Sequence, residues 1–228
     1  MAMKGAPNFN RLAKLYRWME FFSFGPLLAL TRGTFVDKLR DRRKALILGD
    51  GDGRFTARLL RANAAVHVDA VDGSGAMLAA LLSRAGQDAC RVSTQLADIR
   101  GWSPLGPETG REEPYDLIAT HFFLDCLTAE EVEALAGQTR RAVAPGALWV
   151  VSEFAVPSGW FGLLIARPVV AGLYHSFGLL TGLTVRALPD YAEALRGMGF
   201  RLLERRLRLS GLLVAELWGL NEMDTAKR

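Results

Sequence analysis

The chain has 228 residues, of which 50% are hydrophobic and 23% charged, and this composition excludes an intrinsically disordered protein. Its two cysteines, Cys90 and Cys126, match no zinc-ligand or redox spacing, so structural zinc is not expected. We expect both to be reduced thiols in a cytoplasmic protein. The net charge of +4 is uneven, because residues 1–44 carry +7 and the remainder −3. A basic leader of this kind fits contact with anionic lipid or nucleic acid, or equally a solvated helix face. No apolar core precedes its basic residues, so no cleavable signal peptide is expected.

Hydrophobic periodicity and turn signals predict alternating strands and helices in a single domain. Strands are predicted at 45–48, 66–71, 92–96, 115–120, 147–154, 201–209 and 212–217. Helices are predicted at 11–22, 55–62, 75–84, 129–142 and 189–198, with helical material from 160 to about 180. Strands that alternate with helices form a parallel sheet covered on both faces. The last two strands are separated only by Ser210–Gly211, so they are predicted to form an antiparallel hairpin.

A glycine loop follows the first predicted strand, in the stretch ALILGDGDGRF at 45–55. Its glycines stand at alternate positions: Gly49, Gly51 and Gly53. Glycine at the end of a strand lets the backbone turn tightly and a ligand approach closely. A dinucleotide fingerprint would require a third glycine where Arg54 stands, and a pyrophosphate is disfavoured beside Asp50 and Asp52. The loop therefore suits a cation better than a phosphate.

The next two strands supply groups that fit an adenosine. Asp72 ends the second strand about twenty residues after the loop, the spacing at which a carboxylate holds both ribose hydroxyls. After the third strand, Asp98 is placed to accept a hydrogen bond from an adenine amino group, with Ile99 and Trp102 as apolar walls. The predicted ligand is an adenosine that carries positive charge instead of phosphates. S-adenosylmethionine, with its sulfonium and ammonium, has this chemistry.

These motifs occur in an order that is typical of one enzyme family. The ordered set is LILGDGDG, VDGSGAML, ADI, YDLIATHFFLD, APGALWVVSEF and LPDYAEALRGMGF. From Ala45 onward the chain resembles a class I S-adenosylmethionine-dependent methyltransferase. The resemblance implies a Rossmann-like α/β fold: a seven-stranded, mostly parallel sheet with a C-terminal antiparallel hairpin, helices on both faces and a helical lid. The segments NFNRLAKLYRWMEFFSFG and SEFAVP, the latter followed by an apolar insert, look like the ubiquinone/menaquinone biosynthesis C-methyltransferases.

The domain organisation and cofactor site follow from this resemblance. We predict a helical cap at 1–44 and a methyltransferase domain at 45–228, with a lid insert at about 158–186. The predicted cofactor-binding residues are Gly49, Asp50, Gly51, Asp52, Gly53, Asp72, Gly73, Met77, Asp98, Ile99 and Thr120. Family members carry an acid that binds the methionine ammonium where this chain has Ile47. One hypothesis is that Asp50 or Asp52 supplies the missing countercharge. The alternative is that both are turn-forming aspartates that face solvent.

The segment THFFLDCLT, after the fourth strand, is the predicted position of catalytic groups. His121 is a candidate base and Asp125 a candidate hydrogen-bond partner of the substrate, in apolar surroundings that shift pKa values. Alternatively, His121 binds a backbone carbonyl and Asp125 caps the next helix. Other candidates are Tyr174, His175 and Tyr191 on the lid side, and Glu153, which either touches a ligand or closes a loop. No metal is predicted.

Two segments indicate a hydrophobic substrate. Residues 160–183 carry one charge, Arg167, followed directly by Pro168, which argues against a membrane span and for apolar lid helices. The predicted helix at 11–22 has an apolar stripe that docks on the domain or, alternatively, rests on an anionic membrane.

We therefore predict methyl transfer to a small hydrophobic or aromatic acceptor, such as a quinone precursor or another lipophilic metabolite. The enzyme is expected in the cytoplasm, with peripheral membrane contact as an option. The alternative function is a non-catalytic S-adenosylmethionine- or nucleoside-binding module, which the departure at Ile47 favours. A nicotinamide oxidoreductase is disfavoured by Arg54 and the loop acids. Nucleic acid is not an expected partner, because no aromatic-basic stripe accompanies the basic leader.

Overall fold

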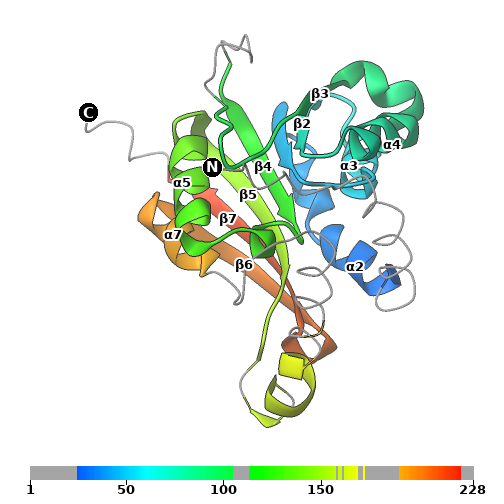
Figure 1. Ribbon diagram of the computed structural model, residues 1–228. Helices are drawn as coiled ribbons and strands as arrows, with labels where there is room; N and C mark the ends of the chain where they lie inside the picture. Colours follow the sequence, from blue (N-terminus) through cyan, green and yellow to red (C-terminus); the bar gives the residue numbers. More distant parts are fainter. Residues whose placement is uncertain are drawn as a thin grey trace, which may run out of the picture.

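Seven strands form one sheet at the centre of the protein (Figure 1). The computed structural model describes residues 25–104, 113–157, 159–160, 162–168, 172 and 190–221. The strands are β1 (Lys44–Leu48), β2 (His67–Asp72), β3 (Val92–Leu96), β4 (Tyr115–His121), β5 (Val143–Phe154), β6 (Phe200–Arg208) and β7 (Leu213–Leu220). Their order in the sheet is β3-β2-β1-β4-β5-β7-β6.

The direction of the strands confirms the predicted fold class. The pairs among β1 to β5 are parallel, whereas β7 pairs antiparallel with both β5 and β6. The order of the parallel strands reverses beside β1, and β1 therefore ends at the point where open α/β sheets bind their ligands.

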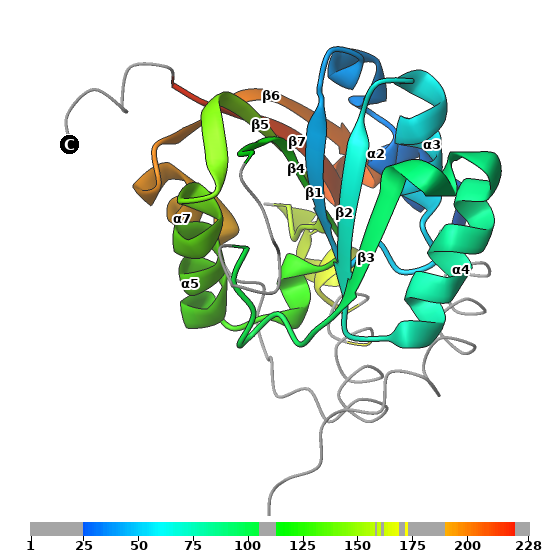
Figure 2. The ribbon, with the colours of Figure 1, turned by 90° about the horizontal axis from the view of Figure 1, so that it is seen from above.

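Helices cover both faces of the sheet, as Figure 2 shows. The longer ones are α2 (Gly25–Arg32), α3 (Arg54–Ala62), α4 (Gly75–Ala85), α5 (Ala129–Arg140) and α7 (Tyr191–Gly197). Short helical turns are η1 (Val36–Leu39), η2 (Gly86–Arg91), η4 (Leu124–Cys126), η5 (Gly162–Ala166) and η6 (Leu209–Gly211). None of the helices in the described ranges is long and apolar enough to cross a membrane.

Strand β1 shows how the core is divided. Successive side chains of a strand point to opposite faces of the sheet. Ala45 and Ile47 lie in a cluster with α3 and α4, whereas Leu46 and Leu48 lie in a cluster with α5 and α7. A strand that is buried on both faces reads as a continuous apolar run, which is why Ala45–Leu48 is recognisable in the sequence.

Three features of the fold differ from the sequence prediction. Strand β5 begins at Val143 instead of residue 147, because an irregular register against β4 accommodates Pro145 and Gly146 within the strand. The β6–β7 connection is Leu209–Leu212, longer than the predicted two-residue turn. Helix α2 and the turn η1 were not predicted. The predicted helix at 11–22 and most of the predicted helical material at 160–180 lie outside the described residues.

The side chain of Asn63 joins the segment before β1 to the segment before β2. Its amide donates hydrogen bonds to the carbonyl oxygens of Leu39 (2.8 Å) and Arg42 (2.7 Å). Its carbonyl oxygen accepts from the backbone N–H groups of Ala65 (2.9 Å) and Val66 (3.1 Å). This one buried residue therefore satisfies four backbone groups.

Replacing Asn63 by alanine should lower the free energy of unfolding by about 2–4 kcal/mol, because it leaves buried backbone groups without partners. Urea denaturation of the variant and the wild type measures the change. Gln87→Ala, at an exposed position in η2, serves as the control. A loss under about 1 kcal/mol would show that water replaces the amide.

Candidate active site

The three glycines of the loop after β1 all have positive φ angles, but for different packing reasons. A Cβ on Gly49 (φ +66°) would overlap the ring of Phe123. A Cβ on Gly53 (φ +78°) would lie 2.6 Å from Cγ of Leu81, on α4. Glycine at these two positions therefore permits close packing within the protein.

Gly51 differs because the space above it is open. At φ +59°, a Cβ here would meet only Sδ of Met77, at 4.0 Å, among the described residues. Met77 lies in the first turn of α4, and its N–H donates to the N-cap hydroxyl of Ser74. Bare backbone under open space is what close approach of a ligand requires.

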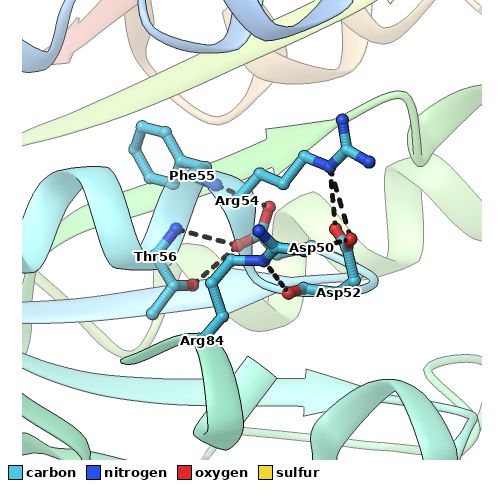
Figure 3. A network of polar contacts seen from close by, with 6 residues as sticks. All are labelled: Asp50, Asp52, Arg54, Phe55, Thr56 and Arg84. Atoms are coloured by element: carbon cyan, nitrogen blue, oxygen red, sulfur yellow. Dashed lines mark hydrogen bonds and ion pairs between the residues drawn. The ribbon is translucent and has the colours of Figure 1, made fainter. Parts of the chain in front are cut away.

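Asp50 points into the protein and caps α3 (Figure 3). Its carboxylate accepts hydrogen bonds from Phe55 N (3.3 Å), Thr56 N (2.8 Å) and Thr56 Oγ1 (2.7 Å). Burial raises the pKa of this carboxyl, and these hydrogen bonds and the guanidinium of Arg32 oppose the rise. The alternative of a solvent-facing turn residue is therefore wrong for Asp50, which is 8% exposed.

Asp52 lies between two arginines (Figure 3). Its carboxylate is 3.2 Å from Nε of Arg54 and 2.6 Å from a terminal nitrogen of Arg84. Nε of Arg84 donates a hydrogen bond to the Asp52 carbonyl oxygen at 2.8 Å. These two guanidinium groups offset the charge of Asp52. Of the two acids proposed to replace the one missing at Ile47, Asp50 is the one without an arginine ion pair among the salt bridges described.

Asp72 stands at the end of β2 and faces the glycine loop. Its carboxylate accepts hydrogen bonds from the N–H of Ser74 (2.8 Å) and from the backbone of Gly51. Burial raises the pKa of Asp72 to about 6, these hydrogen bonds lower it, and the neighbouring Asp50 raises it further. The open space above Gly51 therefore has a carboxylate at its border, as a ribose site requires.

The predicted adenine side is more exposed. Asp98 accepts from Arg100 N (3.1 Å) and lies 3.4 Å from the Arg100 guanidinium. Trp102 is buried, and its indole N–H donates to Oε1 of Gln95 at 2.6 Å. Ile99 is partly buried against the same core cluster, so it and Trp102 form an apolar surface beside Asp98.

Two further predicted cofactor residues differ in exposure. Gly73, directly after β2, is exposed. Thr120 is fully buried near the end of β4, and its hydroxyl accepts a hydrogen bond from the indole N–H of Trp149 at 3.0 Å. The hydroxyl of Thr120 therefore has a partner on β5, inside the core.

His121 is buried at the end of β4. Its Nδ1 lies 2.9 Å from Oγ of Ser152, whose hydroxyl donates to the Thr31 carbonyl oxygen (3.4 Å). A Ser152 hydroxyl that donates to Thr31 can accept a hydrogen bond from Nδ1 of His121. Nε2 has no hydrogen-bond partner among the described residues. The partner of His121 is thus a hydroxyl, and the backbone-carbonyl alternative is wrong.

The environment of His121 keeps its ring neutral. Burial holds the pKa of His121 well below its usual value, and the nearby guanidinium of Arg32 lowers it further. The ring of Phe55 packs against the imidazole with centroids 4.2 Å apart.

Asp125 lies in η4, beyond the end of β4. Burial raises its pKa to about 6, and the thiol of Cys126 donates to it at 3.4 Å. It does not cap the next helix: Thr128 is the N-cap of α5 and forms a reciprocal capping box with Glu131. The helix-capping alternative for Asp125 is therefore wrong.

The sequence prediction missed Arg32, the last residue of α2. Its side chain is buried, and its guanidinium carbon lies 5.1 Å from the ring centroid of Phe122. Its charge lowers the pKa values of Asp50, His121 and Glu153, which places it among the candidate residues. The available signal was a single arginine at the end of the apolar run GPLLALT, counted there as part of the basic leader.

The remaining candidates fall into two groups. Tyr174 and His175 lie outside the described residues. Tyr191 begins α7, and burial and a hydrogen bond to Glu216 raise its pKa. Within the described part of the chain, no group of three or more His, Cys, Asp or Glu side chains is arranged to hold a metal ion.

Comparison with known proteins shows which family model the region around this site resembles. Residues 45–146, which include the glycine loop, Asp72 and His121, match the family model described as a methyltransferase domain. The match covers less than half of the 228 residues. S-adenosylmethionine, the cofactor predicted from the sequence, carries a methyl group on a sulfonium and contains a ribose. The open Gly51 backbone beside the Asp72 carboxylate fits such a cation with a ribose.

Solved structures show the same fold. An O-methyltransferase family protein from Burkholderia thailandensis has a TM-score of 0.69 at 15% identity, covering 95% of this chain and 62% of its own. The mitomycin 7-O-methyltransferase MmcR has a TM-score of 0.68 at 14% identity, covering 93% and 60%. The N-methyltransferase NodS from Bradyrhizobium japonicum WM9, in complex with S-adenosyl-l-homocysteine, has a TM-score of 0.58 at 15% identity, covering 89% and 90%. The chain thus spans about three fifths of the length of the first two proteins. No curated protein sequence matches it.

Proposed function

We propose that this protein transfers the methyl group of S-adenosylmethionine to a small hydrophobic or aromatic acceptor. The observation that carries the proposal is the open backbone at Gly51 bordered by the Asp72 carboxylate. The predicted cofactor residues from Gly49 to Thr120 form the binding site, with Asp50 as countercharge in place of an acid at Ile47. His121, the last residue of β4, or Asp125, in η4, acts on the acceptor.

A lipophilic acceptor is supported by the described part of the predicted lid. Trp160, Leu163 and Leu164 are between 60% and 71% exposed beside the end of β5. Exposed apolar side chains in this segment favour a hydrophobic acceptor, such as a quinone precursor, and peripheral contact with a membrane that holds it. Both cysteines are free thiols, which supports a cytoplasmic location.

The test combines binding and transfer. Calorimetric titrations should show binding of S-adenosylmethionine and S-adenosylhomocysteine and none of NADH. Incubation with radiolabelled cofactor and a lipid extract should then label a lipophilic product. Binding without transfer to any extract would favour a non-catalytic module, and binding of NADH alone would overturn the proposal.

A further inference from the structure

The two carboxylate oxygens of Glu153, near the end of β5, differ in their hydrogen bonding. Its Oε1 accepts hydrogen bonds from the N–H groups of Phe123 (3.0 Å) and Leu124 (2.8 Å), in the loop after β4. Its Oε2 is buried and has no hydrogen-bond partner among the described residues, and the residue is 1% exposed. An unpartnered buried carboxylate oxygen is costly, so Oε2 is suited to a donor that arrives with a ligand.

The loop held by Glu153 also borders the cofactor loop. The ring of Phe123 fills the space where a Cβ of Gly49 would be, so Phe123 contacts Glu153 through its backbone and the glycine loop through its ring. Glu153 is thus separated from the Gly49–Gly53 loop by a single residue. Under the proposed function this loop holds the cofactor, and Glu153 is then one residue away from the cofactor site.

The surroundings of Glu153 and His121 shift their pKa values in opposite directions. The groups that interact electrostatically with Glu153 are Asp125, Cys126, Tyr191 and Arg32. Burial, and after it the Asp125 carboxylate, raise the pKa of Glu153 well above its usual value, whereas Arg32 lowers it. The pKa of His121 is shifted down. A base with a raised pKa holds a proton more firmly, and one with a lowered pKa less firmly.

We propose that Glu153 is the general base of the reaction, with Oε2 receiving the proton of a hydroxyl group on an aromatic acceptor. This rests on the proposed function. The acceptor O–H bond breaks and its proton forms a bond with Oε2. The electron pair left on the acceptor forms the new bond to the methyl group, whose bond to sulfur breaks with its electrons remaining on sulfur. The proton on Glu153 later returns to solvent. The Arg32 charge stabilises the negative charge that develops on the acceptor.

The variant Glu153→Gln isolates this role. The glutamine carbonyl can keep both hydrogen bonds from Phe123 and Leu124, so only the unpartnered oxygen changes. With 4-nitrophenol, 4-cyanophenol and 4-methylphenol as acceptors, kcat should fall about 10²–10⁴-fold, with the smallest loss for the most acidic phenol. The dissociation constant of S-adenosylmethionine should stay within about twofold. Glu216→Gln is the matched control, because both oxygens of that buried glutamate already have partners in Arg205 and Trp218.

A second readout does not depend on turnover. In the complex with S-adenosylhomocysteine, bound 4-nitrophenol should show its phenolate absorption band with the wild type and lose that band with Glu153→Gln. Equal bands in both proteins, or a kcat loss that is the same for all three phenols, would overturn the assignment of the base.

The wild type alone provides a further test should the variant fail to fold. The acid limb of the pH profile of kcat/KM should lie at the same pH for all three phenols, because it belongs to Glu153. A limb that moves with the acidity of the phenol would overturn the proposal, as would cofactor binding without transfer to any of the phenols. Failure of the proposed function is a separate result, in which the wild type binds no S-adenosylmethionine.

Discussion

Replacing Gly51 by alanine should weaken binding of S-adenosylmethionine at least about 100-fold while the protein still folds. At φ +59° an alanine costs about 1–2 kcal/mol of backbone strain, but its Cβ would meet no described atom closer than Met77 Sδ at 4.0 Å. The methyl group would instead occupy the space assigned to the cofactor. Isothermal titration calorimetry measures the affinity, and a thermal melt confirms folding.

The chain offers a control for backbone strain. Gly86 also has φ +59°, and a Cβ there would meet nothing within 4 Å among the described residues. Gly86→Ala should therefore reduce stability without changing the affinity for S-adenosylmethionine. Unchanged affinity in Gly51→Ala would place the cofactor elsewhere.

Replacing Asp72 by asparagine should have opposite effects on binding and on stability. Loss of a charged acceptor for the ribose hydroxyls should weaken S-adenosylmethionine binding about 10- to 100-fold. The folded-state pKa of Asp72, about 6, exceeds its usual value of 3.8, so burial of the carboxylate costs stability as the pH rises through 6. At pH 8 the ligand-free variant should therefore be more stable than the wild type, by on the order of 1–3 kcal/mol.

The sign of this stability effect can be checked against pH. At pH 4 the wild-type carboxyl is largely protonated in the folded state, so the variant should lose most of its advantage. Asp88→Asn, in an ion pair with Arg91 in η2, is the control and should change neither affinity nor this pH trend. Reduced stability of Asp72→Asn at pH 8 would show that the carboxylate stabilises the empty site.

The sequence was sufficient to predict that the glycine loop and Asp72 lie at one edge of the sheet, because the information there is local. Parallel strands bring their carboxyl ends to one edge, so locating the ends of β1 and β2 placed Gly51 and Asp72 together. The loop acids could not be resolved in this way. Asp50 and Asp52 have the same local pattern, and only the start of α3 and the position of Arg84 on α4 decide that one caps a helix and the other forms ion pairs.

The hydrogen-bond partners of Glu153 could not be predicted because these contacts join distant segments. The N–H groups of Phe123 and Leu124 bind Glu153, 29 to 30 residues away in sequence, and neither segment alone indicates this. Arg32 is the last residue of α2, a helix that was not predicted, and its charge was counted as part of the basic leader. Ser152 contacts both His121 and the Thr31 carbonyl oxygen because the register of β4 and β5 places it beside His121. This register cannot be read from either strand alone.

A crystal structure of the chain with S-adenosylhomocysteine tests the central claim most directly. The ribose hydroxyls should lie within hydrogen-bond distance of the Asp72 carboxylate, and the ligand should pass over the Gly51 backbone without contact from any side chain at that position. A ligand bound away from Gly51, or an Asp72 carboxylate turned from the ribose, would contradict the account.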